Sequence, residues 1–195
     1  MGHGLSAIIL GGNFIRLDIF SDASGIAVHS DNSYLGALGR ALIAAGGPIG
    51  PTIAGSLFVV GSSKKNLTRL ILFLLSLVLI ISDILWVRTT FGFIIILIFA
   101  LLIGFIALKT GDKVQRISLQ FLGIQAFLSL YLSVSYLFSG GGVINGVTFK
   151  SDTQHIADSL LLPYWFWATC ILAFSIFLIF FSFRKVIRSG TKQVL

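Results

Sequence analysis

The chain has 195 residues, of which 56% are hydrophobic and only 11% are charged, and its mean hydropathy is +0.99. A soluble domain carries about 25% charged residues, so this composition excludes a soluble globular protein and predicts one integral membrane domain over residues 1–195. The net charge of +7 comes from 14 Lys and Arg residues against seven acidic residues, all of them aspartate. The basic residues lie in short loops between apolar runs, which favours membrane topology over nucleic-acid binding as their cause.

The first 30 residues do not have the pattern of a membrane-spanning helix. Residues 1–12 are apolar and glycine-rich, and they indicate the second half of a helix. Residues 14–30 are rich in β-branched and aromatic side chains that partly alternate with polar ones, and Ser-Asp-Ala-Ser-Gly interrupts them at 21–25. This pattern predicts a β-hairpin. At membrane depth such a hairpin must lie against protein or water, because lipid cannot satisfy its edges.

Five apolar runs that are long enough to cross a bilayer follow the hairpin. The fold class predicted from them is an all-α polytopic membrane protein with a partial N-terminal helix and a small membrane-associated β-hairpin. A Gly/Pro cluster at 46–51 in the first run is expected to kink the helix and to let neighbouring helices approach closely. We predict spans at about 36–61, 70–87, 91–108, 117–138 and 163–183.

The loop charges predict an orientation. The loops on one side of the predicted spans contain only Arg88 and Lys150, whereas ten basic residues lie on the other side. By the positive-inside rule the side with ten cations is cytoplasmic. Residues 184–195 would then form a basic cytoplasmic tail, most simply at the cell (inner) membrane. The ten cations are Lys64, Lys65, Arg69, Lys109, Lys113, Arg116, Arg184, Lys185, Arg188 and Lys192.

Few residues are candidates for metal chemistry. Zinc hydrolysis uses two His at positions i and i+4 of a helix, a third ligand from elsewhere and a Glu as general base. His3 lies on the predicted N-terminal helix, although a single His is also compatible with an incidental position. Asp152 either caps the short polar helix that leads to Pro163 or acts as a carboxylate ligand. His155 could share a helical face with Asp152, whereas Asp158 is expected to face elsewhere.

Asp83 is a further candidate because it lies inside a predicted span. Ionisable groups within a membrane are functional candidates by default. Arg88 follows five residues later, near the end of the same span. An ion pair between Asp83 and Arg88 at the membrane interface is the competing interpretation.

Four stretches and one shorter link, taken in chain order, resemble one family. They are a Gly-His-Gly-Leu-Ser-Ala start followed by Gly-Gly, an Asp-x-Ser-Gly hairpin, an Ala-Ala-Gly helix with prolines, a Val-Arg-x-x-Phe-Gly link and a Ser-Asp segment with a later Pro and Trp. They are similar to motifs of the bacterial, B-type branch of the site-2-protease-like zinc metallopeptidases (peptidase M50B-like). In the link, Thr89 replaces the usual Asn of that family. The stretches cover residues 2–12, 19–25, 44–55, 87–92 and 151–167.

The resemblance implies zinc-dependent hydrolysis of a peptide bond near or within the bilayer. A membrane protein or a peptide would be the substrate, and the lipid bilayer but no nucleic acid would be a partner. The resemblance makes His3 the second zinc-binding His of H-E-x-x-H and Asp152 the third ligand. His155 and Asp83 remain secondary candidates on the grounds of their positions in the sequence. Met1 would occupy the third position of that motif.

The sequence departs from the family at the motif itself. The first His and the catalytic Glu have no counterpart, and the sequence contains no glutamate. No catalytic residue is therefore assigned, and the chain as written is expected neither to hold zinc tightly nor to be active. Either the start has been placed inside the motif, so that the sequence is N-terminally truncated, or the motif has been lost. We expect the first, because a membrane protein rarely begins in the middle of a helix.

Two other functions compete with a peptidase. One is a catalytically inactive scaffold or regulator that binds membrane proteins. The other is a small transporter, which the Gly/Pro cluster of the first span would suit. A transporter of this kind usually has a second broken helix in a matching position, and the sequence shows none.

Overall fold

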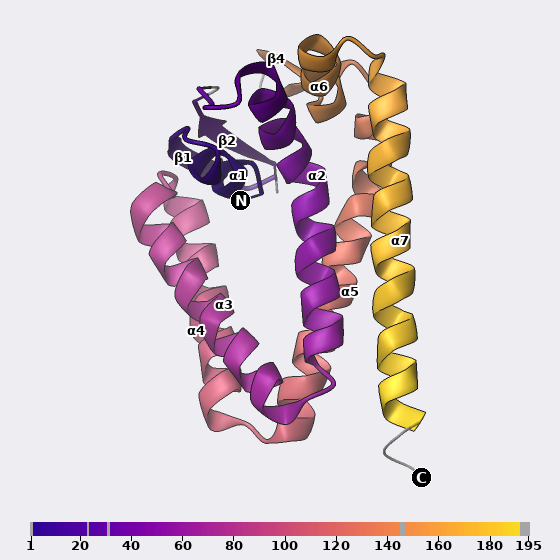
Figure 1. Ribbon diagram of the computed structural model, residues 1–195. Coiled ribbons are helices and arrows are strands. Elements are labelled where there is room, and N and C mark those ends of the chain that lie inside the picture. Colours follow the sequence, from indigo (N-terminus) through magenta and orange to yellow (C-terminus); the bar gives the residue numbers. More distant parts are fainter. Residues whose placement is uncertain (1, 23, 31, 145–146, 192–195) are drawn as a thin grey trace.

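The computed structural model describes residues 2–22, 24–30, 32–144 and 147–191. Met1, which the resemblance places inside the motif, and Lys192 of the predicted tail lie outside the described residues. The described residues form seven helices and four strands (Figure 1). In chain order these are α1 (Gly2–Ile9), β1 (Phe14–Ile19), β2 (Gly25–His29), α2 (Gly36–Gly61), α3 (Lys65–Trp86), α4 (Thr90–Lys109), α5 (Asp112–Leu137), β3 (Gly141–Ile144), β4 (Val147–Lys150), α6 (Asp152–Leu160) and α7 (Tyr164–Thr191).

Five helices, α2 to α5 and α7, are long and apolar enough to cross a membrane. The predicted fold class is confirmed. Two of these helices begin five residues before their predicted starts, α3 at Lys65 and α5 at Asp112. Polar residues in a first turn continue a helix beyond its apolar part, and hydropathy detects only the apolar part.

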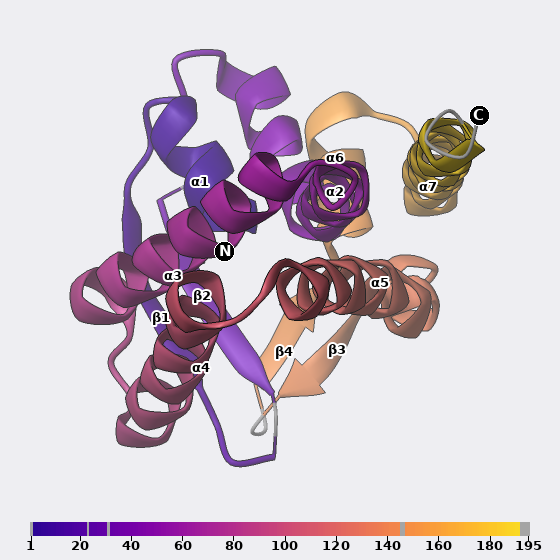
Figure 2. The same cartoon turned by 90° about the horizontal axis from the view of Figure 1, so that it is seen from below.

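The centre of the bundle is α2, which contacts α1, α5, α6 and α7 (Figure 2). An apolar cluster joins α2 to α5, α6 and α7, and a second cluster joins α3, α4 and α5. Large apolar side chains along the outer faces are exposed. Lipid tails are as apolar as these side chains, so the outer faces need no protein cover. The first cluster consists of Ala41, Ala44, Leu130, Leu137, Ile156, Ala168 and Ile171, and the second of Ile71, Leu72, Ile103, Ala107 and Leu119.

The predicted N-terminal hairpin is present as strands β1 and β2, which pair antiparallel. The outer edge of β1 is covered by the link between α3 and α4. Leu17 forms a parallel bridge with Val87, and its carbonyl accepts a hydrogen bond from the Arg88 backbone N–H at 3.2 Å. The Thr89 hydroxyl accepts from Ile19 N at 3.1 Å and donates to Ile19 O at 2.8 Å. The side chain that replaces Asn here thus satisfies two backbone groups of the β1 edge.

A second antiparallel hairpin, β3–β4, lies between the fourth and fifth predicted spans. Its first strand begins at Gly141, whose φ of +146° favours glycine. The signal that could have predicted it is the dipeptide Asn-Gly at 145–146, which is typical of hairpin turns when apolar residues flank it. Those two residues themselves lie outside the described ranges. The hairpin connects the end of α5 to the start of α6.

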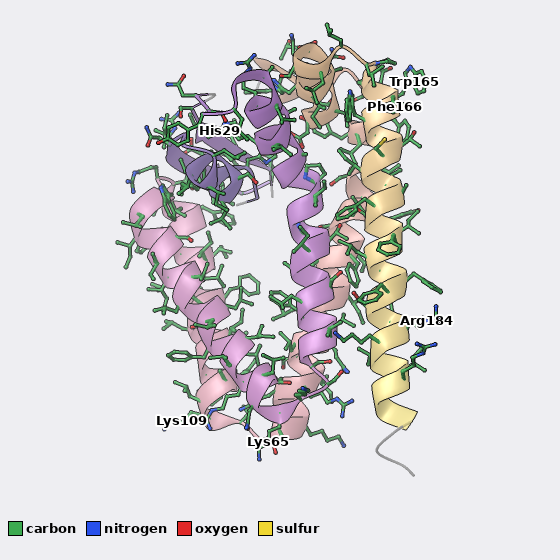
Figure 3. All side chains as sticks on the ribbon, in the orientation of Figure 1. His29, Lys65, Lys109, Trp165, Phe166 and Arg184 are labelled. Carbon is green, nitrogen blue, oxygen red and sulfur yellow. The ribbon has the colours of Figure 1, made fainter. Side chains whose placement is uncertain are left out.

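The two ends of the molecule differ in character (Figure 3). Lys65, Lys109 and Arg184 lie at one end of the bundle, and His29, Trp165 and Phe166 lie at the opposite end. Helices α1 and α6 and the hairpin β1–β2 share the end that carries His29 (Figure 1). The polar residues of the candidate site described below therefore lie at the end of the bundle opposite these three cations.

Candidate metal centre

His3 is held on α1, which packs closely against α2. The helix ends in a Schellman motif, in which Gly11 has a φ of +86°, Gly11 N–H donates to Ile8 O and Gly12 N–H donates to Ala7 O. The His3 ring lies directly over Gly47 of α2, where a Cβ atom would be 1.7 Å from the ring Cε1. The glycines of α2 therefore allow the close approach of helices that the sequence predicted.

Asp152 is the first residue of α6. Ser151 caps this helix, and its hydroxyl accepts a hydrogen bond from the Gln154 backbone N–H at 3.2 Å. An acidic residue in the first turn is favourable because the N-terminal end of a helix carries a partial positive charge. The start of α6 thereby presents the Asp152 carboxylate at the end of the bundle that holds α1.

The structure brings His3 and Asp152 together across 149 residues of sequence. The distance between His3 Nε2 and Asp152 Oδ1 is 2.7 Å. The contact is a hydrogen bond when the imidazole is neutral and an ion pair when it is protonated. The two side chains are 24% and 20% exposed, so both remain accessible from a cavity.

Two cavities flank this pair. The larger has a volume of about 730 Å³ and is bordered by charged, polar and apolar side chains. The smaller, of about 460 Å³, is bordered mainly by α1, α2 and α5. His3, Tyr136 and Asp152 line both. The larger cavity is lined by His3, Leu17, Gly25, Ile26, Ala27, His29, Arg40, Ala44, Tyr136, Phe149, Lys150, Asp152, His155, Asp158 and Ser159.

The secondary candidates on α6 are placed at the same cavity. His155 lines it, one helical turn after Asp152. Asp158 lines it as well, so the expectation that this residue faces elsewhere is wrong. Its carboxylate accepts hydrogen bonds from Lys150 Nζ and Gln154 Nε2, each at 2.7 Å. These two bonds hold the pKa of Asp158 below its ordinary value. The Asp158 carboxylate is therefore already paired with Lys150 and Gln154.

Asp83 is not placed at the site. It lines neither of the two cavities beside His3 and Asp152. Its side chain is 1% exposed, and its two oxygens have no hydrogen-bond partner among the described residues. The expected ion pair with Arg88 is wrong, because the Arg88 guanidinium donates instead to the carbonyls of Leu85 at 2.6 Å and Val87 at 3.1 Å. Basic side chains commonly bond the last carbonyls of a helix in this way.

Sequence reasoning missed several residues of the cavity. His29 stacks on His3 with ring centroids 5.7 Å apart. All three histidines of the chain therefore line one cavity. Arg40 and Tyr136 were also missed, since each lies in an apolar helix without any local motif. Only the arrangement of helices and hairpins at one end of the bundle could have indicated them.

The pair His3 and Asp152 fits part of a zinc site. An imidazole nitrogen and a carboxylate oxygen are both common zinc ligands. Two ligands of one tetrahedral zinc ion lie roughly 3.4 Å apart, so the 2.7 Å contact needs to open by less than about 1 Å to admit the ion. Among the described residues no group of three His, Cys, Asp or Glu side chains could hold a metal. The described residues therefore offer two side chains of the types that bind zinc and not a complete site.

Fold and site together define a class of protein: a multi-pass membrane protein in which a helical His meets an Asp from a distant helix at one end of the bundle. The family model of the Peptidase M50B-like proteins matches residues 1–182. The chain belongs to this family, and it is an intramembrane peptidase-like protein. No curated protein and no solved structure matches it.

Proposed function

We propose that this protein is a zinc-dependent intramembrane peptidase in which His3 and Asp152 are two of the zinc ligands. The observation that carries the proposal is the 2.7 Å contact between His3 Nε2 and Asp152 Oδ1. Two residues that lie 149 positions apart come together at a cavity. Both are polar side chains of the types that bind zinc, in a chain of a peptidase family.

The residues of the chain would have distinct roles in binding zinc and admitting the substrate. His3, held against Gly47, and Asp152, at the start of α6, would fix the ion at the boundary of the two cavities. Zinc, when bound, would supply a nucleophile by making water more acidic. The larger cavity would admit water and the peptide, and the apolar bundle would restrict bulk solvent. The sequence contains no glutamate, so we do not assign the general base to any of its residues.

We further propose that an extended segment of the substrate pairs with β2. The outer edge of β1 is covered by Val87 and Arg88, whereas Gly25, Ile26 and Ala27 of β2 line the cavity that holds His3 and Asp152. An exposed strand edge binds an extended peptide through backbone hydrogen bonds. Addition of a strand at β2 would bring the peptide backbone alongside the two ligands.

The positive-inside rule also gives an orientation for the site. If the end with Lys65, Lys109 and Arg184 is cytoplasmic, then α1 and α6 lie towards the opposite face of the membrane (Figures 1 and 3). The C-terminal residues of α7 would then be cytoplasmic and the protein would reside in the cell (inner) membrane. Cysteine labelling with a membrane-impermeant reagent tests this, with one cysteine placed at Ser159 and another at Lys113.

The experiment that tests the function combines sequencing with zinc analysis. The genomic codons in frame before Met1 are read first, and the protein is then purified from membranes as its gene encodes it. We expect about one zinc ion per chain, lost in His3→Ala and Asp152→Ala and retained in His155→Ala. The His155→Ala variant is the matched control, because His155 lines the same cavity and lies on the same helix as Asp152.

Cleavage of a membrane-embedded peptide is measured on the same preparations, with and without a zinc chelator. We expect cleavage to follow the zinc content across the variants. If the parent protein holds no zinc, or if zinc content is the same in all four proteins, the proposal is wrong. An inactive scaffold or regulator would then be the better description of the protein.

A further inference from the structure

The two residues that flank Asp152 are completely buried although both are polar. Ser151 and Thr153 are each 0% exposed, whereas the Asp152 side chain between them is 20% exposed and reaches His3. A buried hydroxyl is costly unless it is hydrogen-bonded. The hydrogen-bond partners of these two hydroxyls therefore indicate the structural role of residues 151–153.

Both hydroxyls donate to carbonyl groups at or just after the C-terminal end of α5. Thr153 Oγ1 donates to Leu137 O at 2.6 Å, and Ser151 Oγ donates to Ser139 O at 2.6 Å. The last carbonyls of a helix have no partner within the helix and are available as acceptors. The end of α5 thus provides the acceptors that the start of α6 requires.

Two more hydrogen bonds tie the same segments together. Ser151 N–H donates to Gly140 O at 3.3 Å, and the Tyr136 hydroxyl donates to Lys150 O at 3.0 Å. Four hydrogen bonds therefore connect residues 136–140 with residues 150–153, on both sides of Asp152. We call this set of bonds the α5–α6 clamp.

We infer that Ser151 and Thr153 are positioning residues, which hold Asp152 at hydrogen-bond distance from His3 by fixing the start of α6 to the end of α5. Neither residue lines either of the two cavities, so each acts through Asp152 and not on a ligand. The consequence for zinc rests on the proposed function, whereas the consequence for the contact between His3 and Asp152 does not. Partners that orient a metal ligand typically change metal affinity by about 10- to 100-fold when they are removed.

Thr153 is the better residue to test. The Ser151 hydroxyl also caps α6 through Gln154 N–H, so its removal would weaken the helix and the clamp together. Among the described residues, the Thr153 hydroxyl forms hydrogen bonds only with Leu137 O and the Ser151 hydroxyl. Thr153→Val keeps the shape of the side chain and removes the hydroxyl, and Thr153→Ser keeps the hydroxyl.

The chain offers a matched control in Thr68. Its side chain is also buried, and its hydroxyl donates to Lys64 O at 3.0 Å and to Gly61 O at 3.2 Å, the latter a carbonyl at the end of α2. Thr68 lies in the first turn of α3, close to Lys65, which Figure 3 shows at the opposite end of the bundle from His29. Thr68→Val therefore removes a buried hydroxyl from the end of a helix without touching the clamp.

The direct measurement is nuclear magnetic resonance of protein labelled with ¹⁵N-histidine, in which only three histidines contribute. The Nε2 resonance of His3 reports its hydrogen bond to Asp152, and Asp152→Ala gives its position when that bond is absent. We expect Thr153→Val to shift the resonance towards the Asp152→Ala position. Thr153→Ser and Thr68→Val should leave it at the parent position.

Zinc affinity is measured on the same proteins. We expect a loss of about 10- to 100-fold in Thr153→Val and recovery in Thr153→Ser. If Thr153→Val is folded and its His3 resonance stays at the parent position, the inference is overturned even where zinc binding by His3 and Asp152 stands. If the parent binds no zinc, the proposed function fails, and the resonance still decides the inference.

A second variant keeps the test decisive if Thr153→Val does not fold. Tyr136→Phe removes one bond of the clamp from a residue that is 37% exposed, so its loss should cost less stability than the loss of a buried hydroxyl. We expect the His3 resonance to move in the same direction and by less than in Asp152→Ala. An unchanged resonance in a folded Tyr136→Phe protein would overturn the inference.

Discussion

A single added methyl group at Gly47 should separate His3 from Asp152. The Cβ of an alanine there would lie 1.7 Å from His3 Cε1 and 2.4 Å from His3 Nδ1. Non-bonded carbon atoms settle at about 3.5 Å, so the ring has to move by about 1.8 Å. The 2.7 Å contact with Asp152 survives a movement of only about 0.5 Å before it exceeds hydrogen-bond distance. We therefore expect Gly47→Ala to break it.

The fold should tolerate this change. Overpacking costs about 1–3 kcal/mol, and replacement of Gly by Ala inside a helix recovers up to about 1 kcal/mol. Gly50→Ala is the matched control on the same helix, because its Cβ would meet Gly2 Cα at 3.2 Å and would not reach His3. Zinc affinity is measured by competition with a chromophoric chelator, and we expect a loss of at least 10-fold for Gly47→Ala only. Parent-like affinity in a folded Gly47→Ala protein would refute the reasoning.

Three further predictions follow from individual contacts. Thr89→Val removes two hydrogen bonds to Ile19 and should lower the free energy of unfolding by about 1–3 kcal/mol, whereas Thr89→Asn should not; equal melting temperatures would contradict this. Lys150→Gln should raise the pKa of Asp158 towards 3.8, measured by ¹³C resonances. Because the folded-state pKa is lowered, the stability from this contact is present above pH 3.8 and is lost as the pH falls through the folded-state pKa; an unchanged pKa would argue against the contact. Asp83→Asn removes a buried carboxylate that has no hydrogen-bond partner among the described residues and should leave the melting temperature equal or higher; a fall of several degrees would show that the carboxylate is needed.

The sequence predicts those parts of the fold that depend on local pattern. Each long helix is a continuous apolar run of the length that a bilayer requires, and the first hairpin has both alternation and a turn sequence. The second hairpin has strands of only four residues, Gly141–Ile144 and Val147–Lys150. So short a pattern is hard to distinguish from a loop, and only the dipeptide Asn-Gly at 145–146 indicates it.

The candidate site could be predicted only in part. His3 and Asp152 are separated by 149 residues, and no local pattern encodes so distant a contact. The resemblance to a family identified both residues, whereas the packing of α1 and of α6 on α2 is what brings them together. The ion pair of Asp83 with Arg88 was wrong for a local reason, because the guanidinium bonds the carbonyls at the end of α3 instead.

The central claim is that His3 and Asp152 bind one zinc ion together. X-ray absorption at the zinc edge, measured on protein purified from membranes as the gene encodes it, tests this most directly. We predict nitrogen and oxygen ligands at about 2.0–2.2 Å, with the imidazole signal reduced in His3→Ala and the number of oxygen ligands reduced in Asp152→Ala. His155→Ala should give the parent spectrum. A zinc spectrum that is identical in the parent, His3→Ala and Asp152→Ala proteins would contradict the claim.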